Sequence, residues 1–112
     1  MATTTLLTLI LALRTTPLTY SPYLERTAMK TCLVMQKREH NLKEMKRLNY
    51  QFVGENLAFD FYNEKDMVEA LQASPAHRKV QTSKLYTEVG MATCQNKAGL
   101  TTVFLYGGNY GK

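Results

Sequence analysis

The chain lacks most of the sequence features that mark a specialised class of protein. Its 112 residues contain no low-complexity tract and no internal repeat, and they include only two cysteines and two histidines. There is no glycine-rich phosphate-binding loop, no cysteine pair at zinc-finger spacing and no G-x-S-x-G nucleophile elbow. These absences remove the recognisable signatures of nucleotide binding, of a zinc finger and of an α/β-hydrolase, and they leave few candidates for chemistry.

Long hydrophobic runs are also scarce. The apolar stretch Thr5–Leu13 is too short for a transmembrane helix, which needs about 20 residues. A secretory leader could have this length, but no lysine or arginine precedes the stretch and no small-x-small cleavage site follows it. Leu6, Leu9 and Leu13 share a helical face, so we expect a buried first helix rather than a cleaved leader.

Two cysteines are too few for a disulfide framework. Cys32 lies in the mostly apolar stretch TCLVM, and Cys94 lies in VGMATCQ, which is typical of a strand. Buried free thiols are the expectation for such positions. A bridge between them requires their Cα atoms to lie within about 6 Å, so the sequence leaves the pairing open and predicts no redox compartment.

Charge is present in moderate excess, with 14 basic and 9 acidic residues and a net charge of +5. Many of the basic residues lie between Lys37 and Arg47. A basic helix face can bind nucleic acid or an anionic membrane. Because Glu39 and Glu44 interrupt this run and no basic-aromatic strip follows it, we expect a solvated face and no nucleic-acid partner.

The length and a hydrophobic content of 45% suit one domain with a packed core, over residues 1–112. Ser21 as N-cap with Pro22 in the first turn predicts a helix over 22–36, and a shorter helix follows over 41–48. Asn63 predicts the start of another helix, which ends before Pro75. Ser74 and Pro75 together predict the start of a short helix that runs to about residue 80.

The strand signals concentrate in the second half of the chain. Residues 50–59 are rich in aromatic and β-branched side chains, and Gly54 interrupts them, where it would permit a backbone angle or a close approach that a side chain would forbid. Segments 86–95 and 100–106 predict a hairpin around the turn NKAG, and the glycines at 107, 108 and 111 indicate a loose end. This order predicts an α+β fold with an antiparallel sheet.

Three polar residues stand out as candidates for chemistry: His40, Glu55 and His77. Two imidazoles and a carboxylate are ligands that zinc accepts, and they can also form an acid/base pair. Their spacing does not show whether they converge. Structural roles are open for all of them: Glu55 and Asn56 can anchor the strand, His77 can bond local amides, and His40 can interact with a helix dipole. For Arg78 we favour a structural role, as the partner of a surface carboxylate or as a link between helix and sheet.

Four segments occur in the order typical of one family: LTYSPYLERTAMKTCLVMQKREH, GENLAF, SPAHR and YTEVGMA. In these segments the chain resembles the CAP superfamily, which includes the cysteine-rich secretory proteins, antigen 5 and plant pathogenesis-related proteins. The similarity covers nearly the whole chain and is greatest to the bacterial-type branch. It implies a three-layer α–β–α sandwich around an antiparallel sheet, and a secreted, extracellular protein.

The resemblance also implies a site. In the family the matching positions face a common cleft, which carries over to His40, Glu55 and His77 as ligands of a divalent cation such as zinc, with Asn56, Ser74 and Arg78 lining the cleft. Ser74 stands where eukaryotic members have a second glutamate, which weakens the expected metal affinity. Leu71 and Phe104 replace a tryptophan and a glutamine of the family pattern, and these losses are expected to fall on the cleft.

Three functions are consistent with these residues. We favour a non-enzymatic binding module with a His/Glu cleft for a divalent cation or a small ligand; the partner is a small ligand, a lipid or a protein. The second is a hydrolase in which Glu55 and a histidine act as acid and base while Ser74 or a metal-bound water attacks. The third is a basic surface that binds anionic lipid or nucleic acid.

Overall fold

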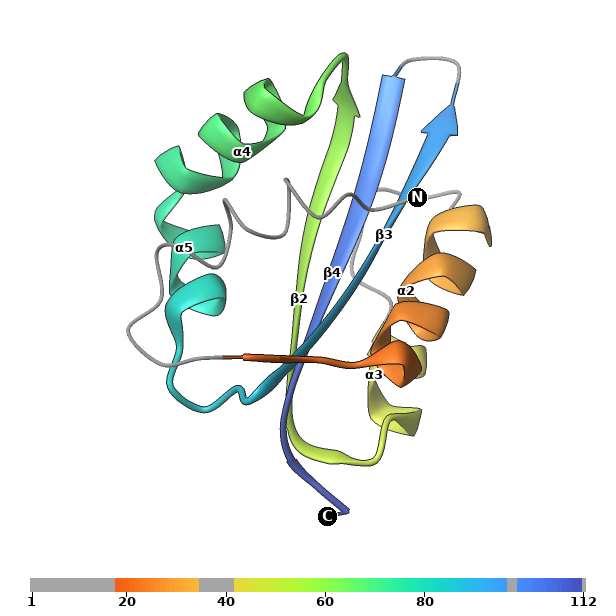
Figure 1. Ribbon diagram of the computed structural model, residues 1–112, viewed down its shortest axis with the longest axis vertical. Helices are drawn as coiled ribbons and strands as arrows, with labels where there is room; N and C mark the ends of the chain where they lie inside the picture. The colour runs from red at the N-terminus through yellow and green to blue at the C-terminus, as the bar shows by residue number, and fades with distance from the viewer. Residues whose placement is uncertain (1–17, 35–41, 97–98, 112) are drawn as a thin grey trace.

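A computed structural model describes residues 18–34, 42–96 and 99–111 of the chain (Figure 1). The described helices are α2 (Pro22–Val34), α3 (Leu42–Arg47), α4 (Glu64–Ala73) and α5 (Pro75–Thr82). The described strands are β1 (Thr19–Tyr20), β2 (Tyr50–Phe61), β3 (Glu88–Asn96) and β4 (Gly99–Tyr110). The first helix expected at Thr5–Leu13 and the basic residues at 37–40 lie outside the described residues.

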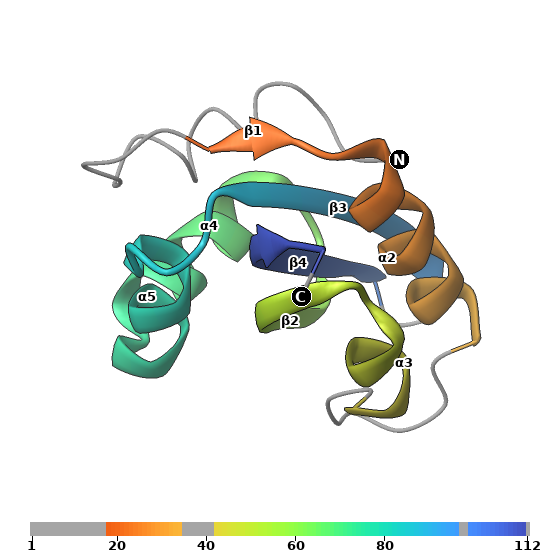
Figure 2. The same cartoon turned by 90° about the horizontal axis from the view of Figure 1, so that it is seen from below.

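The strands form one sheet in the order β1-β3-β4-β2. Strands β3, β4 and β2 are antiparallel, while the two-residue β1 runs parallel to β3 at one edge. Figure 2 shows α4 and α5 on one face of the sheet and α2 and α3 on the other. This arrangement confirms the α+β, three-layer α–β–α sandwich. It adds a parallel edge strand that is too short to leave a pattern in the sequence.

Side-chain capping explains where helices α2 and α4 begin. The Ser21 hydroxyl accepts a hydrogen bond from the Leu24 amide at 3.1 Å, and the Asn63 side chain accepts one from the Asp66 amide at 2.9 Å. Each side-chain oxygen satisfies an amide that has no partner inside its helix. Two of the three expected caps are therefore confirmed, and they set the starts of α2 and α4; the third, Ser74, starts α5 without a side-chain capping bond.

The sheet separates two hydrophobic cores. One core, on the side of α4, includes Met67, Leu71, Phe104 and Tyr106. The other, on the side of α2, includes Leu24, Ala28, Val103 and Leu105. Neighbouring residues of β4 thus contribute to opposite cores, as the alternation of side chains along a strand requires.

Leu71 and Phe104 were expected to lie at the cleft, and this expectation is wrong. Both side chains are almost fully buried, and both belong to the core beneath α4. Burial of an apolar side chain stabilises the fold, so Leu71 and Phe104 extend the core where the family pattern has polar or partly polar residues. They therefore supply packing on the α4 side of the sheet.

The C-terminal strand is longer than expected. Gly107 and Gly108 are buried within β4, so the loose end predicted for them is wrong. A Cβ atom on Gly107 would lie 2.7 Å from the Tyr50 ring, and one on Gly108 would collide with the Leu85 carbonyl oxygen. These glycines allow other parts of the chain to pack directly on the strand.

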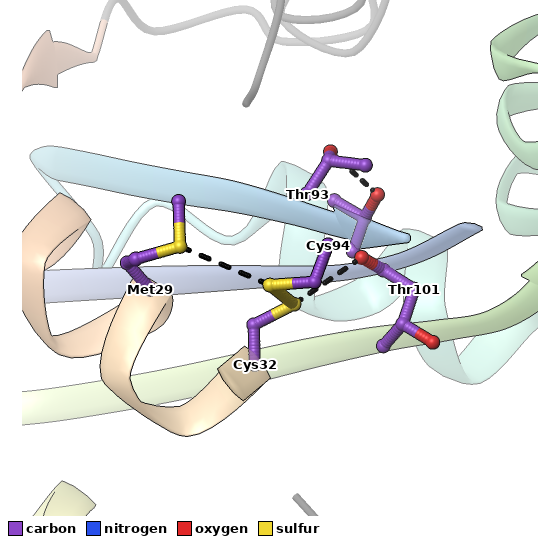
Figure 3. Close-up of a disulfide and its surroundings, with 6 residues drawn as sticks. Met29, Cys32, Thr93, Cys94 and Thr101 are labelled. Carbon is purple, nitrogen blue, oxygen red and sulfur yellow. Dashed lines mark hydrogen bonds between the residues drawn. A yellow bond between two sulfur atoms is a disulfide. The ribbon is translucent and has the colours of Figure 1, made fainter. Parts of the chain in front are cut away.

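Cys32 of α2 and Cys94 of β3 form a disulfide, with their Cα atoms 6.1 Å apart (Figure 3). The expectation of free thiols is therefore wrong. The Met29 sulfur lies 3.8 Å from the Cys94 sulfur, and the Thr101 carbonyl oxygen lies 3.4 Å from the Cys32 sulfur. Thus the bridge lies against both β3 and β4 and fastens α2 to the sheet.

None of the helices within the described ranges is long and apolar enough to cross a membrane.

Candidate functional site

Glu55 lies in the middle of β2, where its side chain is 4% exposed. It pairs across the sheet with Leu105, which packs in the core beneath α2. The flanking residues Val53 and Leu57 belong to the same packing group. Because side chains alternate along a strand, Glu55 extends toward the face that α2 and α3 cover.

Asn56, the next residue, extends toward the other face. Its side-chain amide donates a hydrogen bond of 3.0 Å to the backbone carbonyl oxygen of His77 in α5. The side chain is 3% exposed, so the bond is shielded from water. A buried amide of this kind holds α5 in place on β2, which agrees with the anchoring role left open for Asn56.

The His77 ring hydrogen-bonds to the helix that carries it. Its Nδ1 lies 2.8 Å from the hydroxyl oxygen of Ser74, the N-cap residue of α5. The Ser74 hydroxyl makes no capping bond to a backbone amide. Within the described part of the chain, no carboxylate hydrogen-bonds to the His77 ring, so the geometry shows a serine–histidine pair and no triad.

Arg78 is exposed and bonds to the neighbouring helix. Its guanidinium donates a hydrogen bond of 2.6 Å to the carbonyl oxygen of Gln72, near the C-terminus of α4. The last carbonyls of a helix have no partner inside the helix, and a basic side chain can satisfy them. Arg78 therefore has a structural role, but in the part of the chain that the structure describes it joins α4 to α5 rather than pairing with a carboxylate or linking a helix to the sheet.

Gly54 lies against Tyr86, a contact that the sequence did not predict. The Tyr86 hydroxyl occupies the space that a Cβ atom on Gly54 would fill. Burial raises the pKa of Tyr86 above its usual value. Its ring packs on Tyr106 with centroids 5.6 Å apart. The close approach expected at Gly54 is thus confirmed, and an aromatic ring makes it.

The structure does not bring Glu55 and His77 together. By strand alternation Glu55 extends toward the face of its partner Leu105, whereas His77 belongs to α5, which lies on the opposite face of the sheet (Figure 2). His40 lies outside the described residues, and no group of three His, Cys, Asp or Glu side chains within those residues could hold a metal ion. A cleft shared by all three predicted ligands therefore has no support in the geometry of Glu55 and His77.

The Gly-Glu-Asn triplet explains why Glu55 and His77 lie on different faces of the sheet. Its glutamate and asparagine are neighbours on a strand and must extend to opposite faces. Once Asn56 bonds to the backbone of His77, Glu55 has to face away from that histidine. The sequence does not show that Asn56 bonds to α5, and this contact decides that Glu55 faces away from His77.

The chain belongs to the cysteine-rich secretory protein (CAP) family, because the family's sequence model matches residues 11–109. Among solved structures, an outer surface protein of Borrelia burgdorferi is similar, with a TM-score of 0.78 and 16% identity over 97% of this chain and 96% of that one. Venom allergen-like protein 4 of Schistosoma mansoni has a TM-score of 0.70 and 13% identity, over 82% of this chain and 70% of that one. At these identities the likeness concerns the fold alone. No curated protein matches the chain.

Proposed function

We propose that this protein is a non-enzymatic binding module that works outside the cell. The observation that carries the proposal is the separation of Glu55 from the Ser74–His77 pair by the sheet. A hydrolase that uses these residues needs the nucleophile, the base and the carboxylate at one point. Their placement on two faces favours ligand binding over the acid/base mechanism.

The proposed site is centred on Glu55, beneath α2 and α3. Glu55 is almost fully buried on this face, and a carboxylate is a ligand type that zinc accepts. His40 precedes Leu42, the first residue of α3, by two positions in the sequence. We propose that His40 and Glu55 hold a divalent cation such as zinc, or a small polar ligand, without His77.

The extracellular location rests on two observations. The Cys32–Cys94 disulfide supports an oxidising compartment, since such bonds rarely persist in a reducing cytosol. The family to which the chain belongs is described as secretory. An extracellular binding module could take a small ligand, a lipid or a protein as its partner, and the cation is the ligand that Glu55 favours by its charge.

Zinc titration by calorimetry tests the site. We expect the intact chain to bind zinc and both His40→Ala and Glu55→Gln to weaken the binding more than about tenfold, because each removes a ligand. His77→Ala should retain the affinity of the intact chain, because His77 lies on the other face. Circular dichroism of each variant checks that the fold is intact.

The pattern across the variants separates the alternatives. A folded His77→Ala variant that loses zinc binding would restore the three-ligand cleft and contradict the separation of His77 from Glu55 by the sheet. Absence of zinc binding in the intact chain would remove the cation and leave a small polar ligand. Equal affinity in all three variants would place the metal elsewhere on the chain.

A further inference from the structure

The outer surface of α2 and α3 carries two basic stripes. On α2, Arg26, Lys30 and Leu33 are exposed and are spaced by four and three residues, so they share one face of the helix. On α3, the exposed Lys43, Lys46 and Arg47 have the same kind of spacing. We call these six residues together the α2–α3 basic surface.

One acidic residue joins the stripes. The Glu44 carboxylate lies 3.8 Å from the Lys30 ammonium of α2 and 3.3 Å from the Arg47 guanidinium of α3. The Glu44 side chain is 22% exposed, whereas those of Lys30 and Arg47 are 64% and 61% exposed. The carboxylate is therefore the more buried partner of two outward-facing cations, and the surface keeps a positive excess.

The charge is distributed unevenly between the two faces of the molecule. Helices α2 and α3 carry five basic and two acidic side chains, a net charge of +3. On the other face, α4 and α5 carry three of each sign, a net charge of zero. A positive field on one face orients the protein toward an anionic partner.

We propose that the α2–α3 basic surface docks on an anionic lipid bilayer. Basic side chains near a membrane are attracted to anionic headgroups, and an apolar side chain among them can enter the headgroup–acyl boundary. Leu33 supplies that side chain, because it stands at the end of the Arg26–Lys30 stripe and is 71% exposed.

Leu33 also distinguishes a bilayer from nucleic acid. Proteins that bind single strands without sequence preference combine basic side chains with aromatic rings on which bases stack. The exposed residues of α2 and α3 include no aromatic ring, because Tyr23 is half-buried and its ring packs against those of Tyr50 and Tyr110. The apolar member of the α2–α3 basic surface, Leu33, is aliphatic. Docking on lipid leaves Glu55 beneath the same helices, so it goes beyond the binding role proposed for that residue.

Vesicle flotation with the full chain tests the proposal. We expect binding to phosphatidylcholine vesicles that contain about 30% phosphatidylserine, and little binding to phosphatidylcholine alone. The affinity should fall steeply with added salt, since the Debye length shrinks to about 3 Å at 1 M. Lys43→Gln with Lys46→Gln should weaken binding about 25-fold, at about fivefold for each charge.

A matched control removes the same charge from the other face. Lys65→Gln with Lys79→Gln takes one lysine from α4 and one from α5, and it should change the affinity less than about twofold. Leu33→Ser should weaken binding at least about fivefold and leave the salt dependence unchanged. Circular dichroism checks that each variant is folded.

Three outcomes would overturn the proposal. The first is absence of binding to the phosphatidylserine vesicles. The second is an equal loss in the two lysine pairs, which would mean that total charge and not this surface determines binding. The third is tighter binding to single-stranded RNA than to the vesicles at the same salt concentration, which would assign the surface to nucleic acid.

Discussion

At the scale of single residues, two glycines permit contacts that any side chain would block. A Cβ atom on Gly90 would lie 2.5 Å from the carbonyl carbon of Leu24 and would also collide with the Glu25 amide. These are backbone atoms of α2. A Cβ atom on Gly54 would instead meet the end of the Tyr86 side chain, with the ring carbon Cζ at 2.7 Å. The two sites differ in how easily the neighbour can move.

This difference predicts unequal costs for the same substitution. Gly90→Ala should lower the free energy of unfolding by at least about 3 kcal/mol, because α2 must shift away from β3. Gly54→Ala should cost about 1–2 kcal/mol, because the end of the Tyr86 side chain can move away by a small rotation about its Cα–Cβ bond. Urea unfolding followed by circular dichroism measures both. A smaller loss for Gly90→Ala than for Gly54→Ala would contradict the packing of α2 on β3.

For the candidate site, the sequence predicted which residues matter but not how they are arranged. The sequence identified Glu55, Asn56 and His77 as residues of interest, and the structure gives Asn56 and His77 defined hydrogen bonds. The sequence could not show on which face of the sheet each side chain lies. That depends on which strand and helix meet across the fold, which spacing along the chain does not encode.

At the scale of elements, the attachment of α2 to the sheet determines the architecture. Helix α2 is held by the Cys32–Cys94 bridge near its C-terminal end and by the contact of Leu24 with Gly90 near its N-terminal end. It carries one half of the α2–α3 basic surface and covers the face toward which Glu55 extends. Both proposed surfaces therefore depend on its placement.

Removal of the disulfide should loosen this attachment. The two cysteines are 62 residues apart, so the bridge restricts the unfolded chain considerably. In the chain-entropy model a bridge that closes a loop of this size stabilises the folded protein by about 4 kcal/mol. Removal of a native disulfide commonly costs about 2–5 kcal/mol of stability. Cys32→Ala with Cys94→Ala should lower the urea midpoint accordingly.

A reducing agent provides the control for this prediction. It should lower the urea midpoint of the original chain toward that of the double variant and leave the double variant unchanged. If the reductant did not affect the original chain, the two thiols would be free in solution and the bridge would not contribute to stability.

At the scale of the whole molecule, two tyrosine hydroxyls hydrogen-bond to carboxylates that other elements carry. Tyr20 of β1 donates to Glu25 of α2 at 2.7 Å, and Tyr50 of β2 donates to Glu88 of β3 at 2.8 Å. Burial, together with these bonds to carboxylates, raises the pKa of each tyrosine to about 12. The folded protein therefore holds both phenolic protons more tightly than the unfolded chain does.

The raised pKa values predict a loss of stability in alkali. Below pH 10, the pKa of an unperturbed tyrosine, both states keep the protons and the contribution is complete. As the pH rises from there toward about 12, the unfolded chain loses its protons first, so the free energy of unfolding falls. Urea unfolding across this range measures the slope.

The matched variant is Tyr20→Phe with Tyr50→Phe, which keeps the rings and removes both hydroxyls. Its stability should fall less between pH 10 and about 12 than that of the original chain. Parallel curves for the two proteins would show that other groups cause the alkaline loss, and that the two hydrogen bonds do not hold the elements together in this range.

The sequence by itself determined the features that depend on neighbouring residues. Ser21 and Asn63 start their helices because a side chain satisfies an amide within the next turn. The β3–β4 hairpin and the close approach at Gly54 were also predictable, because β-forming side chains and a missing Cβ leave a direct mark. These signals, together with the family resemblance, sufficed for the α–β–α sandwich.

Only the tertiary structure decided which distant residues meet. It paired Cys32 with Cys94, added β1 to the sheet edge, buried Leu71 and Phe104 in the core and placed Glu55 and His77 on opposite faces. Each of these outcomes depends on long-range packing and on the pleat of the sheet. The energy of such contacts is set by segments tens of residues apart, so no local pattern in the sequence records them.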